Sequence, residues 1–201
     1  LVPSSVTFDP DIVDISTSLG DIKLKLPIIG SAMDSVVSPE TAIALSEHGG
    51  LGVLNLEGVQ TRYENPAEVL EKIAAVSKAD YVTLMQGIYQ DQPVREDLIV
   101  KRIEQIKSAG ATVVVSSTPQ NAVKYGKLAE KCGVDAFLVQ STVVSTKHKS
   151  RDGVDPLDLK GLCDMLSIPV WVGNSATYDV TLELLKTGVQ AVFVGIGPGA
   201  A

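Results

Sequence analysis

A pattern of helix end, glycine and apolar run occurs four times and constrains the fold of this chain more than any other feature. It reads EHGGLGVLN at 47–55, KSAGATVVVSS at 107–117, EKCGVDAFLVQ at 130–140 and LKTGVQAVFVG at 185–195. In each copy a helix-like stretch stops at a glycine, which can take the left-handed conformation that ends helices. A strand-like run follows within a few residues. The repeat predicts an α/β protein in which helices alternate with parallel strands.

Six apolar runs are expected to form the strands, since they lack the strict alternation of a half-exposed sheet. They lie at 26–32, 50–55, 111–118, 135–142, 169–174 and 190–197. Helical patterns occupy 38–50, 65–78, 94–110, 119–133, 155–167 and 177–188. The alternating segment 21–26 predicts an exposed hairpin. The stretch YVTLMQGIYQDQP at 81–93 fits neither helix nor strand, and we expect an irregular excursion between units.

The length leaves two α/β architectures open. A (β/α)8 barrel needs about 250 residues, so after the first 25 or so this chain has room for roughly six of its units. An open doubly wound sheet would fit without remainder, and length alone favours it. No linker or low-complexity stretch interrupts the chain, so we treat residues 1–201 as a single domain.

Composition excludes several classes of partner. The formal net charge is -7, which argues against nucleic-acid or anionic membrane partners, because these need clustered Lys and Arg. No run approaches the roughly 20 apolar residues of a membrane helix, and the start shows no signal-peptide pattern. The two cysteines, Cys132 and Cys163, lack metal-type spacing. We expect a cytoplasmic protein that keeps both thiols reduced.

Small polar residues and glycines follow nearly every predicted strand. Taken singly, each fits a turn former, but the carboxyl ends of parallel strands form the ligand face of such proteins. The terminal GIGPGAA is not a dinucleotide fingerprint, which would follow an early strand and open a helix. Its glycines still let backbone groups approach a phosphate or a cation. The candidates are Ser31, Asn55, Ser116, Ser117, Gln140, Ser141, Thr142, Asn174 and the segment 195–199.

The usual catalytic side chains are scarce. His48 is expected at a helix end, where an imidazole complements the helix dipole, and His148 lies in a basic loop and is expected to be solvated. Asp34 is the best-placed carboxylate, although it could equally cap the helix that begins near Ser38. From the residues alone, this is an α/β protein suited to a nucleotide or phosphate, with no visible nucleophile.

Two stretches carry a resemblance to a known family. PIIGSAMDSV at 27–36 and VGIGPGA at 194–200, in this order, resemble the IMP dehydrogenase/GMP reductase family, nearest the branch without inserted regulatory (CBS) domains. The resemblance implies a (β/α)8 TIM barrel and a homotetramer. It also implies that this chain covers roughly the first six units plus an N-terminal hairpin and is incomplete at its C-terminus. The family's catalytic cysteine is then expected directly after Ala201.

The chemistry implied is attack of that cysteine on C2 of a purine nucleotide (IMP, GMP or XMP), with hydride exchange to NAD or NADP. The resemblance places Ser31, Met33, Asn174, Gly195, Gly197 and Ala200 at the nucleotide. It places Gln140, Ser141 and Asn174 at the cofactor, and the carbonyls of Gly197 and Gly199 at a monovalent cation such as K⁺.

Three positions depart from the family pattern. Gln140 with Ser141 stands where dehydrogenases place an Asp-Ser pair for the nicotinamide ribose, and a neutral amide lacks the charge-assisted strength of a carboxylate. Leu56, in NLEG, stands where a His-bearing stretch is usual. Phe193 replaces a basic residue. All three lie on the cofactor or reacting side, so the nucleotide pocket is the safer expectation.

The leading hypothesis is an IMP dehydrogenase that oxidises IMP to XMP through a cysteine thioimidate in guanine nucleotide biosynthesis. A GMP reductase, which converts GMP to IMP with NADPH, is the first alternative. The others are an FMN-dependent barrel oxidoreductase, such as a nitronate monooxygenase, and a non-catalytic nucleotide-binding relative.

Overall fold

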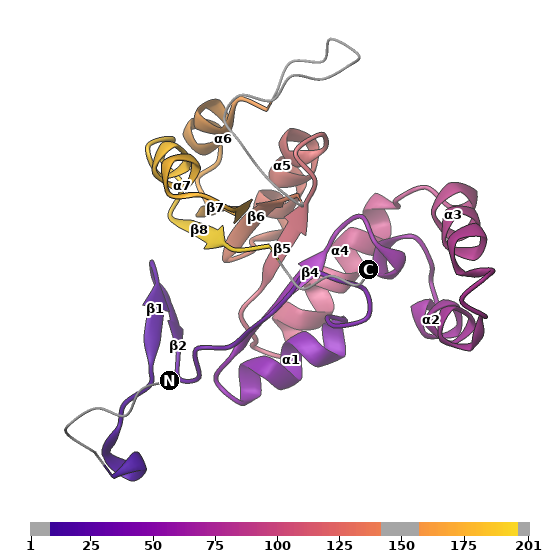
Figure 1. Cartoon of the computed structure of the whole chain (residues 1–201), viewed down its shortest axis with the longest axis horizontal. Coiled ribbons are helices and arrows are strands. Elements are labelled where there is room, and N and C mark those ends of the chain that lie inside the picture. Colours follow the sequence, from indigo (N-terminus) through magenta and orange to yellow (C-terminus); the bar gives the residue numbers. More distant parts are fainter. Residues whose placement is uncertain (1–8, 142–156, 197–201) are drawn as a thin grey trace.

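The computed structural model describes residues 9–141 and 157–196, and its centre is a six-stranded parallel sheet (Figure 1). The strands stand in the sheet in the order in which the chain makes them. They are β3 (Ile29–Gly30), β4 (Leu51–Asn55), β5 (Val114–Ser117), β6 (Ala136–Gln140), β7 (Val170–Ser175) and β8 (Ala191–Val194). All six predicted strands are confirmed.

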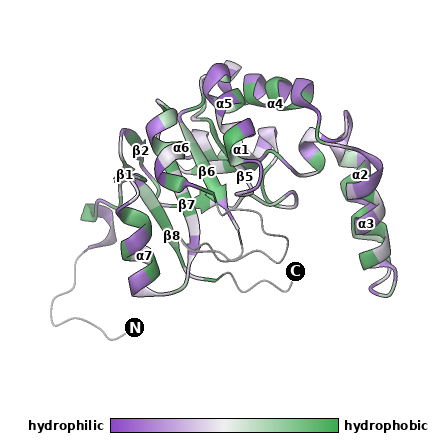
Figure 2. Ribbon diagram, turned by 90° about the horizontal axis from the view of Figure 1, so that it is seen from above, coloured by the Kyte–Doolittle hydropathy of each residue, from purple (hydrophilic) through white to green (hydrophobic). Residues whose placement is uncertain are grey.

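The helices that follow the strands cover one face of the sheet, which curls around its opposite face. Outward side chains of the strands, among them Leu54, Val115 and Phe137, pack with these helices in the largest core cluster. The helices are α1 (Pro39–Glu47), α4 (Glu96–Ser108), α5 (Ala122–Cys132), α6 (Leu159–Met165) and α7 (Tyr178–Leu185). Figure 2 shows apolar strands behind helices that are apolar on one side and polar on the other. An open doubly wound sheet, with helices on both faces, is therefore wrong, and the arrangement is a half-barrel.

The glycines of the repeat adopt the backbone conformation that the sequence predicted. Gly49, Gly110, Gly133 and Gly188 have φ of 83°, 73°, 70° and 99°. A side chain at such φ is strained, so glycine ends each helix and turns the chain into the next strand. These four turns lead from α1, α4, α5 and α7 into β4, β5, β6 and β8 with similar geometry.

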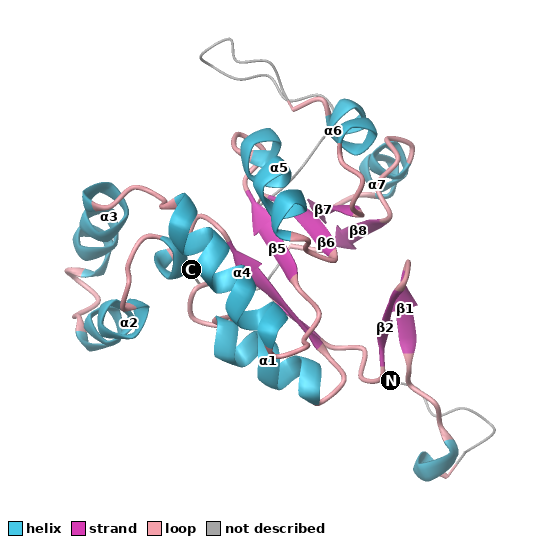
Figure 3. Cartoon of the chain, turned by 180° about the vertical axis from the view of Figure 1, so that it is seen from behind, coloured by secondary structure: helices cyan, strands magenta, loops and turns pink. Residues whose placement is uncertain are grey.

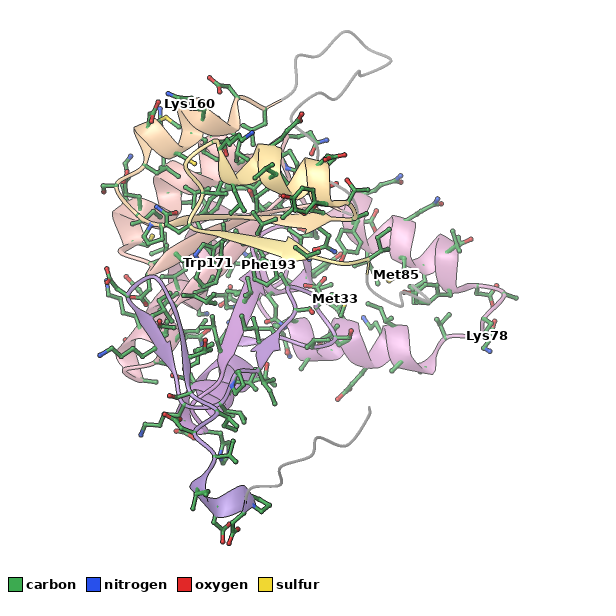
Figure 4. All side chains as sticks on the ribbon, turned by 60° about the vertical axis from the view of Figure 1, so that its left-hand side comes forward. Met33, Lys78, Met85, Lys160, Trp171 and Phe193 are labelled. Carbon is green, nitrogen blue, oxygen red and sulfur yellow. The ribbon has the colours of Figure 1, made fainter. Side chains whose placement is uncertain are left out.

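The concave face of the sheet has its own apolar interior, closed at one end by the predicted hairpin. Strands β1 (Thr17–Leu19) and β2 (Ile22–Leu24) pair antiparallel, after a short 3₁₀ turn, η1 (Pro10–Ile12). Leu24 of the hairpin belongs to the same cluster as Leu51, Leu138 and Trp171. The rings of Trp171 and Phe193 lie 6.1 Å apart on this face, above the hairpin (Figure 4).

The prediction of an irregular excursion at 81–93 is wrong in its local structure. Residues 81–91 form a helix, α3 (Tyr81–Asp91), beside α2 (Pro66–Ala75), and the pair projects from the half-barrel after the short η2 (Val59–Thr61) (Figure 3). Leu84 and Ile88, one turn apart, pack in a small cluster with Val59 and Val69. The exposed Val82 hides this periodicity in the sequence. None of the helices in the described ranges is long and apolar enough to cross a membrane.

Candidate functional site

A ring of small and polar residues stands at the carboxyl edge of the half-barrel. Alternate strand residues share a face, and the concave cluster contains Ile29, Val53, Val114, Leu138, Trp171 and Phe193. Two residues further along each strand, the same inward row reaches Ser31, Asn55, Ser116, Gln140, Gly173 and Gly195. The rim above the apolar interior is therefore made of small and polar residues, as is typical of the ligand face of a parallel α/β barrel.

The structure brings the proposed cofactor residues together. The Ser141 N–H donates to the Gly173 carbonyl (2.9 Å), and the Asn174 N–H donates to the Ser141 carbonyl (3.0 Å). These bonds extend the pairing of β6 with β7 to the rim. The Gly195 N–H donates to the Ser175 carbonyl (2.7 Å), so Gln140, Ser141, Asn174 and Gly195 follow one another along the edge.

Ser31 and Met33 lie in the loop after β3, at the other side of the half-barrel. Both are exposed, and Met33 keeps 49% of its surface accessible. They share with the β6–β8 edge the carboxyl end of the same curled sheet. A ligand that touched both groups would have to span the mouth of the half-barrel.

The Gln140 side chain has an unmet hydrogen-bonding capacity. Among the described residues its Oε1 is one of three buried side-chain polar atoms without a partner, together with Trp171 Nε1 and Asp34 Oδ1. A buried acceptor without a donor loses its water and gains nothing in return. At the rim, a ligand hydroxyl or N–H group could supply the missing donor.

Sequence reasoning missed Glu57 as a link between two rim loops. Its carboxylate accepts from the Thr118 N–H (2.5 Å), the Thr118 hydroxyl (3.2 Å) and the Asn121 side-chain amide (2.5 Å). These bonds tie the loop after β4 to the loop after β5. Glu57 directly follows Leu56, a position already marked as unusual. An acidic residue two places beyond a strand end was the available signal.

Asp34 does not cap α1, so that alternative is wrong. Ser38 caps the helix, accepting from the Thr41 N–H (3.2 Å), while the Ser38 N–H donates to Thr41 Oγ1 (2.7 Å). Asp34 Oδ2 instead accepts from the Val59 N–H (2.9 Å) and the Tyr89 hydroxyl (2.6 Å). Asp34 therefore connects the loop that carries Met33 to the next strand's loop and to α3.

Neither cysteine belongs to the rim. Cys132 ends α5 and Cys163 lies in α6, and both pack against the core between the sheet and its helices. Burial raises the pKa of both thiols, with Glu104 adding to the effect at Cys132 and Asp164 at Cys163. His48 follows α1 as its C-cap residue, as expected at a helix end. These groups are structural.

Because a raised pKa lowers the thiolate fraction at neutral pH, we expect both cysteines to react slowly with iodoacetamide. At pH 7 the folded protein should be alkylated about tenfold more slowly than the same chain in urea. Raising the pH to 9 should bring the alkylation rates of the folded and the unfolded chain closer together, because the thiols of the folded protein then ionise as well. Mass spectrometry of timed samples measures this, and rapid labelling of either thiol in the folded protein at pH 7 would contradict it.

Several candidates lie outside the described residues, namely Thr142, His148, Gly197, Gly199 and Ala200. The phosphate contact of Ala200 and the cation site of Gly197 and Gly199 therefore stay predictions. In the part of the chain that the structure describes, no group of three His, Cys, Asp or Glu side chains could hold a metal ion.

A curled parallel sheet, helices on one face and a polar rim at the strand ends define an α/β-barrel protein, a class that binds its ligands at that rim. The sequence model of the IMP dehydrogenase / GMP reductase domain matches residues 1–201. The chain belongs to this family, and its half-barrel is the first six units of the family's (β/α)8 barrel with the N-terminal hairpin.

Individual proteins that are similar to this chain support the family assignment. An "uncharacterized oxidoreductase" of Mycolicibacterium smegmatis is 32% identical over 98% of this chain and 53% of its own length. The inosine-5'-monophosphate dehydrogenase of Cryptosporidium parvum is 26% identical over 100% of the chain and 50% of its own length. The IMP dehydrogenase/GMP reductase-like protein of Corynebacterium glutamicum superposes with a TM-score of 0.89 at 29% identity, covering 98% of this chain and 52% of that one. The chain thus spans about half the length of these relatives.

Proposed function

We propose that this protein binds a purine nucleotide and a nicotinamide cofactor at the rim of the barrel and oxidises IMP to XMP. Family membership supports the reaction class. The observation that carries the cofactor half of the proposal is the buried Gln140 amide oxygen without a donor, beside Ser141 and Asn174. A nicotinamide-dependent oxidoreductase binds a cofactor beside its substrate, and a ribose hydroxyl of that cofactor could donate to the Gln140 Oε1.

The residues of the β6–β7 edge fit a nicotinamide ribose. Gln140 would accept one ribose hydroxyl through Oε1, and further polar groups are offered by Ser141, directly after it, and by Asn174 on the adjoining strand β7. The bound nicotinamide would supply the hydride exchange. A neutral amide can orient a ribose without the added strength of a charge, so we expect orientation rather than tight binding from Gln140. We propose NAD as the cofactor, with NADP as the alternative.

The nucleotide half of the proposal rests on the loop after β3 and on β8. Ser31 and Met33 are accessible at the rim. A Cβ added at Gly195 would meet no atom within 4 Å, and its φ of 119° favours glycine, so the backbone beside it is open to a ligand. Gly197 and Ala200 would extend this contact to the 5′-phosphate. By resemblance the nucleophile is the cysteine expected after Ala201, a role for which Cys132 and Cys163 are misplaced.

GMP reductase is the second candidate, because the rim departs from the dehydrogenase pattern on the cofactor side. Besides Gln140, the position expected to be basic holds Phe193, whose ring packs on Trp171 and whose Cβ lies where a side chain on Gly173 would be. A K⁺ site at the carbonyls of Gly197 and Gly199, a homotetramer and a cytoplasmic location belong to the proposal in either case.

Replacing Gln140 with leucine in the full-length protein tests the cofactor site. The variant should raise the KM for NAD about tenfold and leave the KM for IMP unchanged, because one ribose hydrogen bond is lost. Absorbance of NADH formed from IMP and NAD gives both constants, and a separate assay for the reductase alternative follows the NADPH consumed when GMP is converted to IMP and ammonia. Gln86→Leu, on the exposed side of α3, is the matched control.

Two results would count against the proposal. If Gln140→Leu has the cofactor KM of the unmodified protein, Gln140 does not contact the cofactor. If calorimetry finds no binding of IMP or GMP to the full-length protein, the purine nucleotide proposal itself is wrong. Flavin absorbance of the purified protein would instead favour the FMN-dependent alternative.

A further inference from the structure

Helix α3 reaches one of the proposed nucleotide loops through the side chain of Tyr89. The Tyr89 hydroxyl donates to Asp34 Oδ2 at 2.6 Å, joining residues 55 positions apart. Asp34 lies in the segment 31–37, which also carries Ser31 and Met33. Neither Tyr89 nor Asp34 is among the residues that the resemblance placed at a ligand.

The segment 31–37 is folded on itself and anchored through Asp34. The Met33 N–H donates to the Ser31 carbonyl (2.8 Å), and the N–H groups of Val36 and Val37 both donate to the Met33 carbonyl (2.9 Å each). These bonds shape the loop, and the buried Val37 side chain and the Thr41 hydroxyl, which donates to the Val36 carbonyl (3.1 Å), hold its end against the core and α1. The Asp34 carboxylate holds the part before Val37, because it accepts from the Val59 N–H of the neighbouring loop as well as from Tyr89.

A glycine makes room for this anchor. An ideal Cβ on Gly58 would lie 1.8 Å from Asp34 Oδ1. Since Asp34 is already held by two hydrogen bonds, any side chain at position 58 would push the carboxylate out of its place. The position of the Asp34 carboxylate beside the Gly58 backbone therefore requires a glycine at position 58.

Arg62 fixes the orientation of Tyr89. Its guanidinium lies 5.1 Å from the centre of the Tyr89 ring and donates to the carbonyls of Tyr89 (3.0 Å), Gln92 (2.6 Å) and Glu57 (3.0 Å). Burial and the Asp34 carboxylate raise the pKa of the Tyr89 hydroxyl. The hydroxyl therefore stays protonated at neutral pH and remains a donor.

We propose that Tyr89 is a positioning residue for nucleotide binding: it holds Asp34, and through Asp34 the Ser31–Met33 loop, at the mouth of the barrel. Tyr89 does not touch the nucleotide in this arrangement. The inference rests on the proposed function for the identity of the ligand. It gives α3, the helix that the sequence did not predict, a role in the site.

The kinetic test compares two tyrosine variants of the full-length protein. Tyr89→Phe removes the bond to Asp34. Tyr63→Phe removes a similar bond to the same helix, the one from the Tyr63 hydroxyl to the Ile88 carbonyl (2.7 Å), and leaves Asp34 untouched. Tyr89→Phe should raise the KM for the purine nucleotide about tenfold and change kcat less than about twofold. Tyr63→Phe should leave both constants unchanged.

A second readout needs no ligand. Hydrogen exchange of the Val36 and Val37 amides should be about tenfold faster in Tyr89→Phe and unchanged in Tyr63→Phe. Faster exchange in the first variant alone supports the proposal even if no purine nucleotide binds, in which case only the proposed function fails. Equal exchange and an equal nucleotide KM in the two variants overturn it, since Tyr89 would then only help to dock α3.

Discussion

Replacing Trp171 with alanine is expected to lower the free energy of unfolding by about 3–5 kcal/mol, the usual cost of removing a buried large aromatic side chain. Trp171 is 0% exposed and fills the concave interior between the sheet and the hairpin. Phe193 on the next strand packs against its ring. The cavity left behind cannot close easily, because parallel strands with paired neighbours surround it.

Two further variants test this prediction. For all three variants, urea denaturation of the full-length protein measures the free energy of unfolding. Trp171→Phe should cost less than about 1.5 kcal/mol, because most of the apolar volume remains and the indole Nε1–H of Trp171 has no hydrogen bond to lose. Tyr178→Ala, at a residue 79% exposed, should change stability by less than about 0.5 kcal/mol. A cost for Trp171→Ala as small as that of Tyr178→Ala would show that the hairpin does not seal the interior.

Arg102 is expected to give the second large loss, about 3–5 kcal/mol on replacement with methionine, because several hydrogen bonds from a charged donor are lost at once and each contributes about 1.5–3 kcal/mol when buried. Its side chain is buried, and its guanidinium donates to the carbonyls of Gln60 (3.0 Å), Tyr63 (3.3 Å) and Glu64 (2.9 Å). Methionine keeps the apolar stem and removes all of these donors. The carbonyl of the buried Gln60 would lose its donor without gaining water, and those of the less buried Tyr63 and Glu64 would lose theirs as well.

Lys101 provides the matched control one residue earlier on α4. Its ion pair with Glu64 is exposed, at 48% and 57% of the two side chains, and exposed pairs contribute about 0–1 kcal/mol. Lys101→Ala should therefore have a small effect in the same thermal or urea melt. If Arg102→Met were equally mild, the carbonyls would have to be solvated, and α4 would not anchor the loop that leads to α2.

The units of the barrel were predictable because their signals are local. A glycine at a helix end needs a positive φ wherever the chain goes next, and the four repeat glycines all have it. The buried strands likewise follow from unbroken Val, Leu and Phe runs. Length, in contrast, favoured the open sheet, because it does not report on which face the helices lie.

Helix α3 was not predictable from its own residues. Its helical face is short, and Val82 on the opposite side is exposed and apolar. The helix forms because Leu84 and Ile88 find Val59 and Val69, contacts that no pattern within 81–93 contains. Glu57 and Tyr89 were not predicted for the same reason, because their hydrogen-bond partners are distant in the sequence.

The sequence by itself determined the α/β class, the positions of strands and turns, and the small polar residues at the strand ends, since each depends on neighbours within a few residues. Only the tertiary structure decided that the sheet curls, that Ser38 rather than Asp34 caps α1, and that Asp34 meets Tyr89 across 55 residues. Those outcomes depend on which distant hydrogen-bond partners and apolar surfaces meet when the chain closes, and local patterns carry no record of them.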